Sequence, residues 1–479
     1  MMKTTLFEKK ILRLLNSYPL FSTFIFVSVF IIVIHSCGDS KINKELISSD
    51  STITFSEHIA PIIYKNCSPC HRPGESGPMS LMNYQQVKSV ANKIKFVTQT
   101  KFMPPWPADP NYSHFIGERT LSELEILKIK LWVEQGAKEG DPKKCPSPPV
   151  FFTGSFFGKP DLQLRMQDAI KLEGNGRDNF LMIKIPYEIS KDTFVKHFEF
   201  VPHQRKLVHH VNGHLICYDN NRPTNHFTGA NILPDALDNF NEHFSKMNLA
   251  YADNKQPNFP PLFTNAVYFL PGYTPPVYPE GVGGFSLSKK GVILLKNVHY
   301  GPSAKTVFDS SYINVFFAKE KPKRPLRELQ IGTFGISPVE PELVIPPETI
   351  KTFHSSWKVP ETISLLSVNP HMHLLGKTFL AYAITPKGDT IRLIKINRWD
   401  FRWQYYYTFK KMLKIPAGSE IHAFGTFDNT SKNPFNPFHP PKTVSQGEGL
   451  ESMQTTEEMF QFIFTYLPYL PGDENNSLE

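Results

Sequence analysis

The sequence predicts a multidomain chain, in which a small all-α domain is followed by two all-β sandwich domains. Helical hydrophobic periodicity is found in the segment 53–145, whereas short strand-like runs separated by turn residues fill the rest of the chain. Proline-rich stretches separate these parts, one at 143–149 and another that begins near Pro322. We therefore expect β domains over 150–330 and 340–472, each built of antiparallel sheets.

The composition agrees with a body that is rich in β-strands. The 479 residues include 42 prolines and 39 phenylalanines, a mixture that disfavours long helices and suits strands joined by many turns. The formal net charge of +8 is not gathered into one basic run, and no basic stripe with interleaved aromatic residues occurs. We therefore expect no nucleic-acid partner.

The first residues have the pattern of an export signal. Basic residues precede an apolar run at 19–34, and Ser36 then stands directly before Cys37. A small residue before a cysteine resembles a bacterial lipobox. We expect a signal peptide over 1–36, lipidation of Cys37 and a polar tether over 37–52, which would anchor the protein to a membrane of the cell envelope. An uncleaved single membrane span is the alternative.

A c-type haem site is the strongest signal in the chain. Cys67, Cys70 and His71 have the C-x-x-C-H spacing, in which two thiols bond to the haem and the histidine is an axial ligand of its iron. A zinc site would need a second cysteine pair, and a thioredoxin-like pair would need a βαβ context. The remaining Cys145 and Cys217 could form a disulfide or remain two free thiols, and the sequence leaves both open.

The residues around this motif predict helices. A capping box at 120–123 precedes an apolar stripe, and Gly136 stands where a C-terminal cap is expected. Three helices around a haem are typical of a compact class I-like cytochrome c. We expect Met103 as the second axial ligand, with Met79 and Met82 as rivals that more often fill apolar space. A haem held by His and Met transfers single electrons.

Histidines on predicted strands form the second set of candidate ligands. His371 and His373 are two residues apart, so they share one face of a strand and can chelate one metal. His209 and His210 are adjacent, so a regular strand directs them to opposite faces. If both bind, the backbone must kink there or the rings must use different nitrogens. His299 stands alone on a further strand.

Four motifs in order point to a family. They are His209-His210, Val298–Gly301 (V-H-Y-G), His371–Gly376 (H-M-H-L-L-G) and Glu458-Met459. This set resembles the copper type II ascorbate-dependent monooxygenases, which include peptidylglycine α-hydroxylating and dopamine β-monooxygenases. The resemblance implies two jelly-roll-like β-sandwiches that hold two copper ions across a cleft.

The resemblance also implies the ligands and the reaction. It assigns the ligands as follows: the first copper to His209, His210 and His299, and the second copper to His371, His373 and Met459. Imidazole suits both copper oxidation states, and a thioether favours Cu(I). The catalytic copper, held by the second set, would use O2 to hydroxylate a C–H bond of a small organic substrate. An external donor, ascorbate-like or a cytochrome, would supply electrons through the fused haem.

The chain departs from the peptide-amidating relatives at the residues that grip a peptide carboxylate. Asn369, Gln461 and Ile463 stand at those positions, so peptide amidation is not expected and the substrate is not readable. A non-enzymatic electron-transfer or copper-binding envelope lipoprotein is the alternative. A structural or glycan-binding body behind a cytochrome is a third interpretation.

Overall fold

The computed structural model describes residues 52–151, 154–235, 240–447 and 455–479. The predicted signal peptide, the lipidated Cys37 and nearly all of the tether lie outside these ranges. None of the helices described is long and apolar enough to cross a membrane.

Five short helical elements form the first part of the described chain. They are η1 (Phe55–Ile59), α4 (Ala60–Asn66), α5 (Tyr84–Ser89), α6 (Ala91–Gln99) and α7 (Glu123–Glu134). Phe55, Ile63 and Trp132 are almost fully buried in the core that these helices share. Helix α7 begins two residues later than the predicted capping box would place it, because the side chain of Ser122 caps it together with Glu125.

The predicted small all-α cytochrome c domain is wrong. The described chain is mostly β, with several sheets, and the helical segment does not stand as a separate all-α unit. Its stretch 103–119 contains no helix and reaches the C-terminal β body, where Ala108 bridges Ile396 and Phe115 bridges Phe409. Local periodicity finds helices, but it does not reveal an extended stretch that pairs with distant strands.

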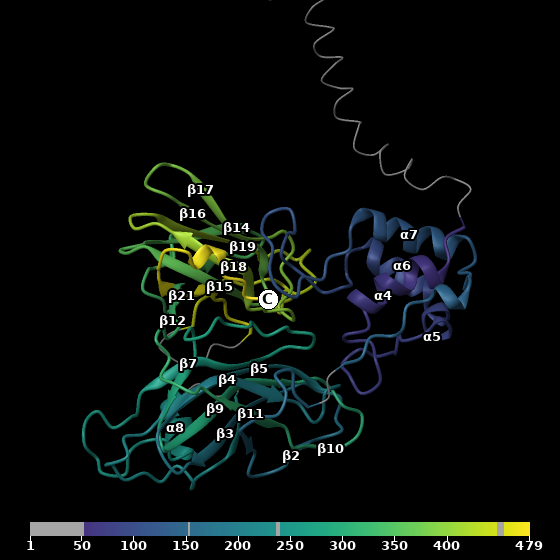
Figure 1. The fold of residues 1–479 in the computed structure, drawn as a ribbon. Helices are drawn as coiled ribbons and strands as arrows, with labels where there is room; N and C mark the ends of the chain where they lie inside the picture. The colour runs from purple at the N-terminus through teal and green to yellow at the C-terminus, as the bar shows by residue number, and fades with distance from the viewer. Residues whose placement is uncertain (1–51, 152–153, 236–239, 448–454) are drawn as a thin grey trace, which may run out of the picture.

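The N-terminal β body is built of antiparallel sheets packed around one core (Figure 1). Its elements are β1 (Leu162–Arg165), β2 (Ile170–Leu172), β3 (Asn179–Glu188), β4 (Thr193–Val201), β5 (Val208–Cys217), β6 (Ile232–Pro234), α8 (Phe240–Lys246), β7 (Leu262–Phe269), β8 (Phe285–Leu287), β9 (Lys290–Tyr300), β10 (Val307–Asp309) and β11 (Tyr312–Phe317). One sheet has the order β6-β3-β9-β5-β7, the second β1-β11-β4-β8, and β10 pairs with β2. Val195, Leu215 and Ile293 are fully buried between the two larger sheets.

The C-terminal β body has the same kind of construction. Its strands are β12 (Arg327–Gly332), β13 (Val344–Ile345), β14 (Ile350–Lys358), β15 (Ile363–Met372), β16 (Gly376–Ile384), β17 (Thr390–Ile396), β18 (Tyr407–Ile415), β19 (Glu420–Asp428), β20 (Val444–Ser445) and β21 (Phe460–Pro468). A short 3-10 helix, η3 (Asp473–Asn475), follows β21. Another, η2 (Pro142–Lys144), lies earlier in the chain, between α7 and β1. Sheets β12-β21-β15-β18 and β14-β19-β16-β17 enclose a core that contains Phe353, Phe379 and Phe460. Strands β15 and β21 are neighbours, which places the second histidine pair beside Met459.

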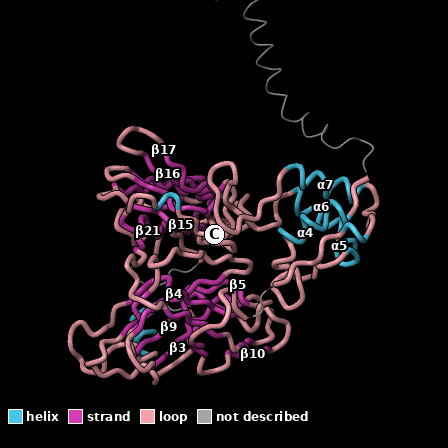
Figure 2. The backbone as a smooth tube through the Cα atoms, in the orientation of Figure 1, coloured by secondary structure: helices cyan, strands magenta, loops and turns pink. Residues whose placement is uncertain are grey.

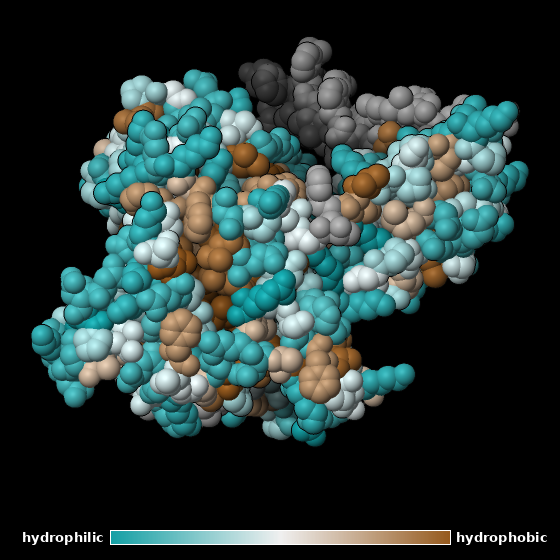
Figure 3. Space-filling model, turned by 60° about the horizontal axis from the view of Figure 1, so that its bottom comes forward, coloured by the Kyte–Doolittle hydropathy of each residue, from teal (hydrophilic) through white to brown (hydrophobic). Residues whose placement is uncertain are grey.

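Aromatic side chains join the three parts of the molecule. The ring of Trp106, from the helical segment, lies 5.3 Å from that of Tyr405 in the C-terminal body. Tyr268 of β7 contacts Tyr406 at 4.8 Å between ring centroids. Figure 2 shows helices α4 to α7 gathered at one side of the two β bodies, joined to them by loops. Figure 3 shows apolar surface along the middle of one face and polar residues at its ends.

Candidate functional site

One pocket contains all four residues predicted to hold a haem. Cys67, Cys70, His71 and Met103 line a largely apolar cavity of about 450 Å³ beside residues such as Leu81. This volume is in the range of small-molecule and cofactor sites. Thiol, imidazole and thioether groups in an apolar pocket are the donor set that a covalently bound haem requires. The residues present therefore fit that group.

The ring of His71 is oriented by the backbone. Its Nδ1 atom lies 3.2 Å from the carbonyl oxygen of Met79, so an Nδ1–H that donates to this oxygen leaves the Nε2 lone pair for a ligand. Burial lowers the pKa of His71, which favours the neutral ring. Met79 lines the same cavity as Met103, whereas Met82 does not. The side chains of Met79 and Met103 are therefore both placed where a second ligand would lie.

The first histidine set lies where β5 and β9 pair. The ring centroid of His299 is 4.6 Å from that of His209 and 5.1 Å from that of His210. The register between the strands shifts on both sides of His210. Such a bulge places an extra residue in one strand. It supplies the kink that two adjacent histidines need to contact one ring.

Asp178 fixes the third ring of this set. Its Oδ1 atom lies 2.7 Å from Nε2 of His299, and the ring of Phe180 stacks on that of His299 at 4.3 Å. By contrast, no hydrogen bond from the described residues reaches the ring nitrogens of His209 or His210. Burial, with neighbouring histidines, lowers the pKa of His210 to about 3. Neutral imidazoles with unengaged nitrogens are suited to bind a metal.

The second set gathers at the end of β15. The rings of His371 and His373 are 5.1 Å apart. Met459 directly precedes β21, whose Phe460 pairs with Met372. The three residues predicted as ligands of the second copper therefore lie side by side.

Two polar residues hold this second set in place. The side chain of Gln404 lies 2.5 Å from Nδ1 of His371. The carboxylate of the fully buried Glu458 accepts the backbone N–H groups of His373 at 2.9 Å, Leu375 at 2.6 Å and Met459 at 3.3 Å. Burial raises the pKa of Glu458 to about 8, although these donors oppose the shift.

No role for Asp178, Gln404 or Glu458 was predicted from the sequence. Glu458 stands in the quoted Glu-Met motif, which was the one available signal. Asp178 and Gln404 lie far along the chain from the histidines that they contact, so only the fold reveals them.

The three groups of residues adjoin one another. His209 lines the Cys67–Cys70 pocket as well as contacting His299. His371 is near enough to lower the pKa of His210, after burial and the two nearer histidines. Trp403 also lines the pocket, next to the Gln404 that contacts His371.

The described residues contain no group of three or more His, Cys, Asp or Glu side chains arranged so that it could hold a metal ion. The second set would not form such a group, because its third donor is a thioether. In the first set, Nε2 of His299 is engaged by Asp178. The copper assignment therefore stays a prediction. The cysteines outside the haem motif, Cys145 and Cys217, are not bonded to each other.

Comparisons with known proteins give no family. No family model matches the chain, and no curated protein matches it. The crystal structure of the infectious bursal disease virus VP2 subviral particle is 9% identical over 66% of this chain and 73% of that chain, with a TM-score of 0.16. The structure of the infectious bursal disease virus Gx strain is 7% identical over 66% and 76%, also with a TM-score of 0.16. At these scores the likeness supports neither a shared fold nor a shared function.

Proposed function

We propose that this protein is a copper-dependent, monooxygenase-like oxidoreductase with a c-type haem as its electron inlet. The observation that carries the proposal is the position of His209, which belongs both to the pocket of Cys67 and Cys70 and to the first histidine set. When bound, the coppers and the haem would supply O2 activation at the second set and single-electron transfer at the other sites. The residues predicted to hold them are as follows: Cys67, Cys70, His71 and Met103 for haem, His209, His210 and His299 for one copper, and His371, His373 and Met459 for the other.

The chain's own side chains would set the ligand orientations. Asp178 holds the ring of His299, and Gln404 holds that of His371. Outer partners of this kind fix ring orientation and raise metal affinity. Glu458 accepts the backbone N–H groups of His373, Leu375 and Met459, so one buried side chain ties the turn after β15 to the residue before β21.

The substrate differs from a peptide with a free carboxylate. The side-chain amide of Asn369 donates a hydrogen bond to the carbonyl oxygen of Tyr405. The side-chain amide of Gln461 donates one to the carbonyl oxygen of Thr333. Both side chains are therefore engaged within the protein at the positions where the resembling enzymes grip a carboxylate. We propose a small organic molecule as the substrate, O2 as the co-substrate and an external reductant as the electron donor.

Metal content and product formation test the proposal together. The isolated full-length protein should contain about two coppers per haem. With a reductant, oxygen uptake should be linked to a hydroxylated product in a screen of candidate substrates. His371→Ala should abolish product formation, and the exposed-surface variant His114→Ala should not. Copper absent from both sets, or product formation that survives His371→Ala, would overturn the proposal.

Electron transfer without hydroxylation is the second candidate. The contact between the haem pocket and the first histidine set would serve it equally well. In that case copper and haem are both present and the haem reduces the copper, but oxygen uptake yields no hydroxylated product with any substrate.

A further inference from the structure

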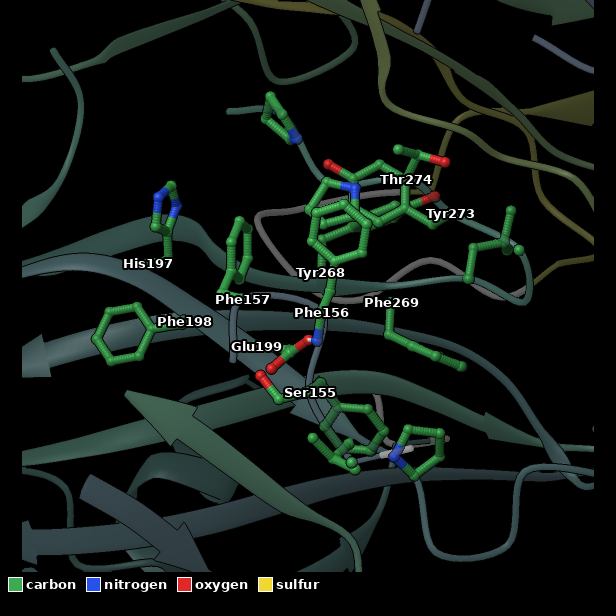
Figure 4. Close-up of a pocket in the computed structure, with 18 of the residues that line it drawn as sticks. Ser155, Phe156, Phe157, His197, Phe198, Glu199, Tyr268, Phe269, Tyr273 and Thr274 are labelled. Atoms are coloured by element: carbon green, nitrogen blue, oxygen red, sulfur yellow. Dashed lines mark hydrogen bonds between the residues drawn. The ribbon is translucent and has the colours of Figure 1, made fainter. Parts of the chain in front are cut away.

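A second cavity, also of about 450 Å³, lies beside the haem-binding segment (Figure 4). Its walls come from Pro69 and Arg72 of the helical segment, from residues 154–157, from β4 and β7, and from the loop 272–278. It contains none of the predicted copper ligands and none of the predicted haem ligands, so the function proposed above does not use it.

Aromatic rings form a large part of these walls. The ring of Phe157 stacks on that of His197, with centroids 4.3 Å apart and planes 8° apart. The ring of Tyr278 lies 6.3 Å from that of His197 and is inclined to it by 16°. Figure 4 shows Tyr268 and Tyr273 in the upper part of the cavity. Parallel rings that leave an open cavity suit a flat aromatic guest.

Two polar groups in the wall lack partners. The Oγ atom of Ser155 and the Nε atom of Arg72 are buried, and no hydrogen bond from the residues that the structure describes reaches either of them. A buried polar group without a partner is unfavourable by about 1–3 kcal/mol. The guanidinium can only donate, and a hydroxyl can donate. A bound molecule with an acceptor at each place would satisfy both.

Arginine side chains in the wall of the cavity favour a bound anion. Arg72 and Arg205 share the single carboxylate of Glu75, at 2.8 and 3.1 Å. Arg119 also lines the cavity and donates to the backbone oxygen of Gly272. Arginine is the side chain best shaped to bind a carboxylate.

A carboxylate also lies in the cavity wall. Figure 4 shows Ser155 beside Glu199, whose carboxylate accepts from the backbone of Phe156 and the amide of Asn314. An anion would be repelled by Glu199. A ring hydroxyl, by contrast, can accept from Ser155 and donate to a carboxylate.

We propose that this cavity binds a hydroxylated aromatic carboxylate. Its ring lies among Phe157, Tyr268 and Tyr278, its carboxylate faces Arg72 and Arg119, and its hydroxyl faces Ser155. Pro69 lies within the C-x-x-C-H segment, and Arg72 directly follows it. The bound molecule would therefore lie next to the proposed haem-attachment site.

Calorimetric titration of the full-length protein tests the proposal with four probes that differ by one feature each. The probes are 4-hydroxyphenylacetate, phenylacetate without the hydroxyl, cyclohexylacetate without the aromatic ring, and 4-hydroxyphenethyl alcohol without the carboxylate. We expect 4-hydroxyphenylacetate to bind most tightly, and the alcohol about ten-fold more weakly because the charge-assisted bonds are lost. Binding of the alcohol or of cyclohexylacetate as tight as that of 4-hydroxyphenylacetate would overturn the proposal, as would no binding of any probe.

Two variants locate the site. Ser155→Ala should weaken the binding of 4-hydroxyphenylacetate about five-fold, which is the usual effect of losing one hydrogen bond. The affinity for phenylacetate should not change. Arg119→Gln should weaken the binding of both acids and leave the affinity for the alcohol unchanged. Ser89→Ala, at the end of α5 outside the cavity, is the matched control. Equal loss for both acids in Ser155→Ala, or no loss in either variant, would place the binding elsewhere and refute the proposal.

Discussion

The Oε1 atom of Gln404 lies 2.5 Å from Nδ1 of His371, and Trp403, the residue before Gln404, lines the cavity that contains Cys67 and Cys70. A single short run of chain therefore contacts both the proposed haem pocket and the second proposed copper set. It joins two sites whose residues lie about three hundred positions apart in the sequence.

Gln404→Ala should weaken copper binding at the second set. Removal of an outer partner of a metal-bound histidine lowers metal affinity by about 10–100-fold, because the ring is no longer held. Copper titration with a competing chelator measures this. Gln163→Ala, on the surface of the other β body, is the control. Unchanged affinity in Gln404→Ala would show that the contact does not position His371.

Asp178→Ala should weaken copper binding at the first histidine set and not at the second set. The Asp178 carboxylate holds Nε2 of His299 at 2.7 Å, so its loss should lower affinity for one copper by about ten-fold and spare the other. Asp178→Asn retains one acceptor oxygen and should recover part of the affinity. Equal weakening of both coppers would indicate general destabilisation.

Glu458→Ala should lower the free energy of unfolding. The Glu458 side chain accepts three backbone N–H groups, alanine leaves these donors without that partner, and the loss should destabilise the fold by about 2–3 kcal/mol. Urea unfolding measures the change. Glu361→Gln, which loses an exposed ion pair with Arg327, should change it by less than about 1 kcal/mol.

Met103→Ala should change the haem spectrum and lower the haem reduction potential, because loss of a thioether ligand stabilises the ferric state. Met79→Ala should leave axial ligation intact if Met103 is the ligand, although Met79 lines the same cavity. Spectroelectrochemical titration of both variants separates the two methionines. A changed spectrum in Met79→Ala alone would reverse the assignment.

The ion pair between Arg324 and Asp473 should raise the free energy of unfolding at neutral pH, and this contribution should be lost in acid. Burial opposes the shift, but the Arg324 guanidinium and the Ser364 hydroxyl hold the pKa of Asp473 at about 2, below the ordinary value of about 3.9. A depressed folded-state pKa adds stability above the unfolded pKa, and this is lost as the pH falls from about 4 to 2. Asp473→Asn should lower stability at neutral pH and flatten the stability profile in that window. An unchanged slope would contradict the shift.

Periodicity and spacing could predict part of this structure. The strands that carry His299 and His371 follow from alternation, and the closeness of Cys67, Cys70 and His71 follows from their spacing. The bulge at His209 could be expected only on the condition that both histidines bind. Sequence could not predict Asp178 or Gln404 as partners, because a hydrogen bond between distant residues has no local pattern.

The all-α prediction failed for a related reason. Helical stripes are visible in sequence, whereas the bridge from Phe115 to Phe409 depends on a strand that comes almost three hundred residues later. An isolated bridge of this kind has no periodic signal.

That bridge has a consequence for how the molecule works. Phe115 contributes its whole side chain to the core of the C-terminal β body, and Ala108 lies against Ile396. A segment packed in this way does not move as a flexibly tethered domain. The span between the C-x-x-C-H pocket and the histidines is set by packing, so the rate of any exchange between them would not depend on diffusion of a tethered module. Deleting residues 52–145 would also leave an open gap in the neighbouring body, and that body should not survive as an independent fragment.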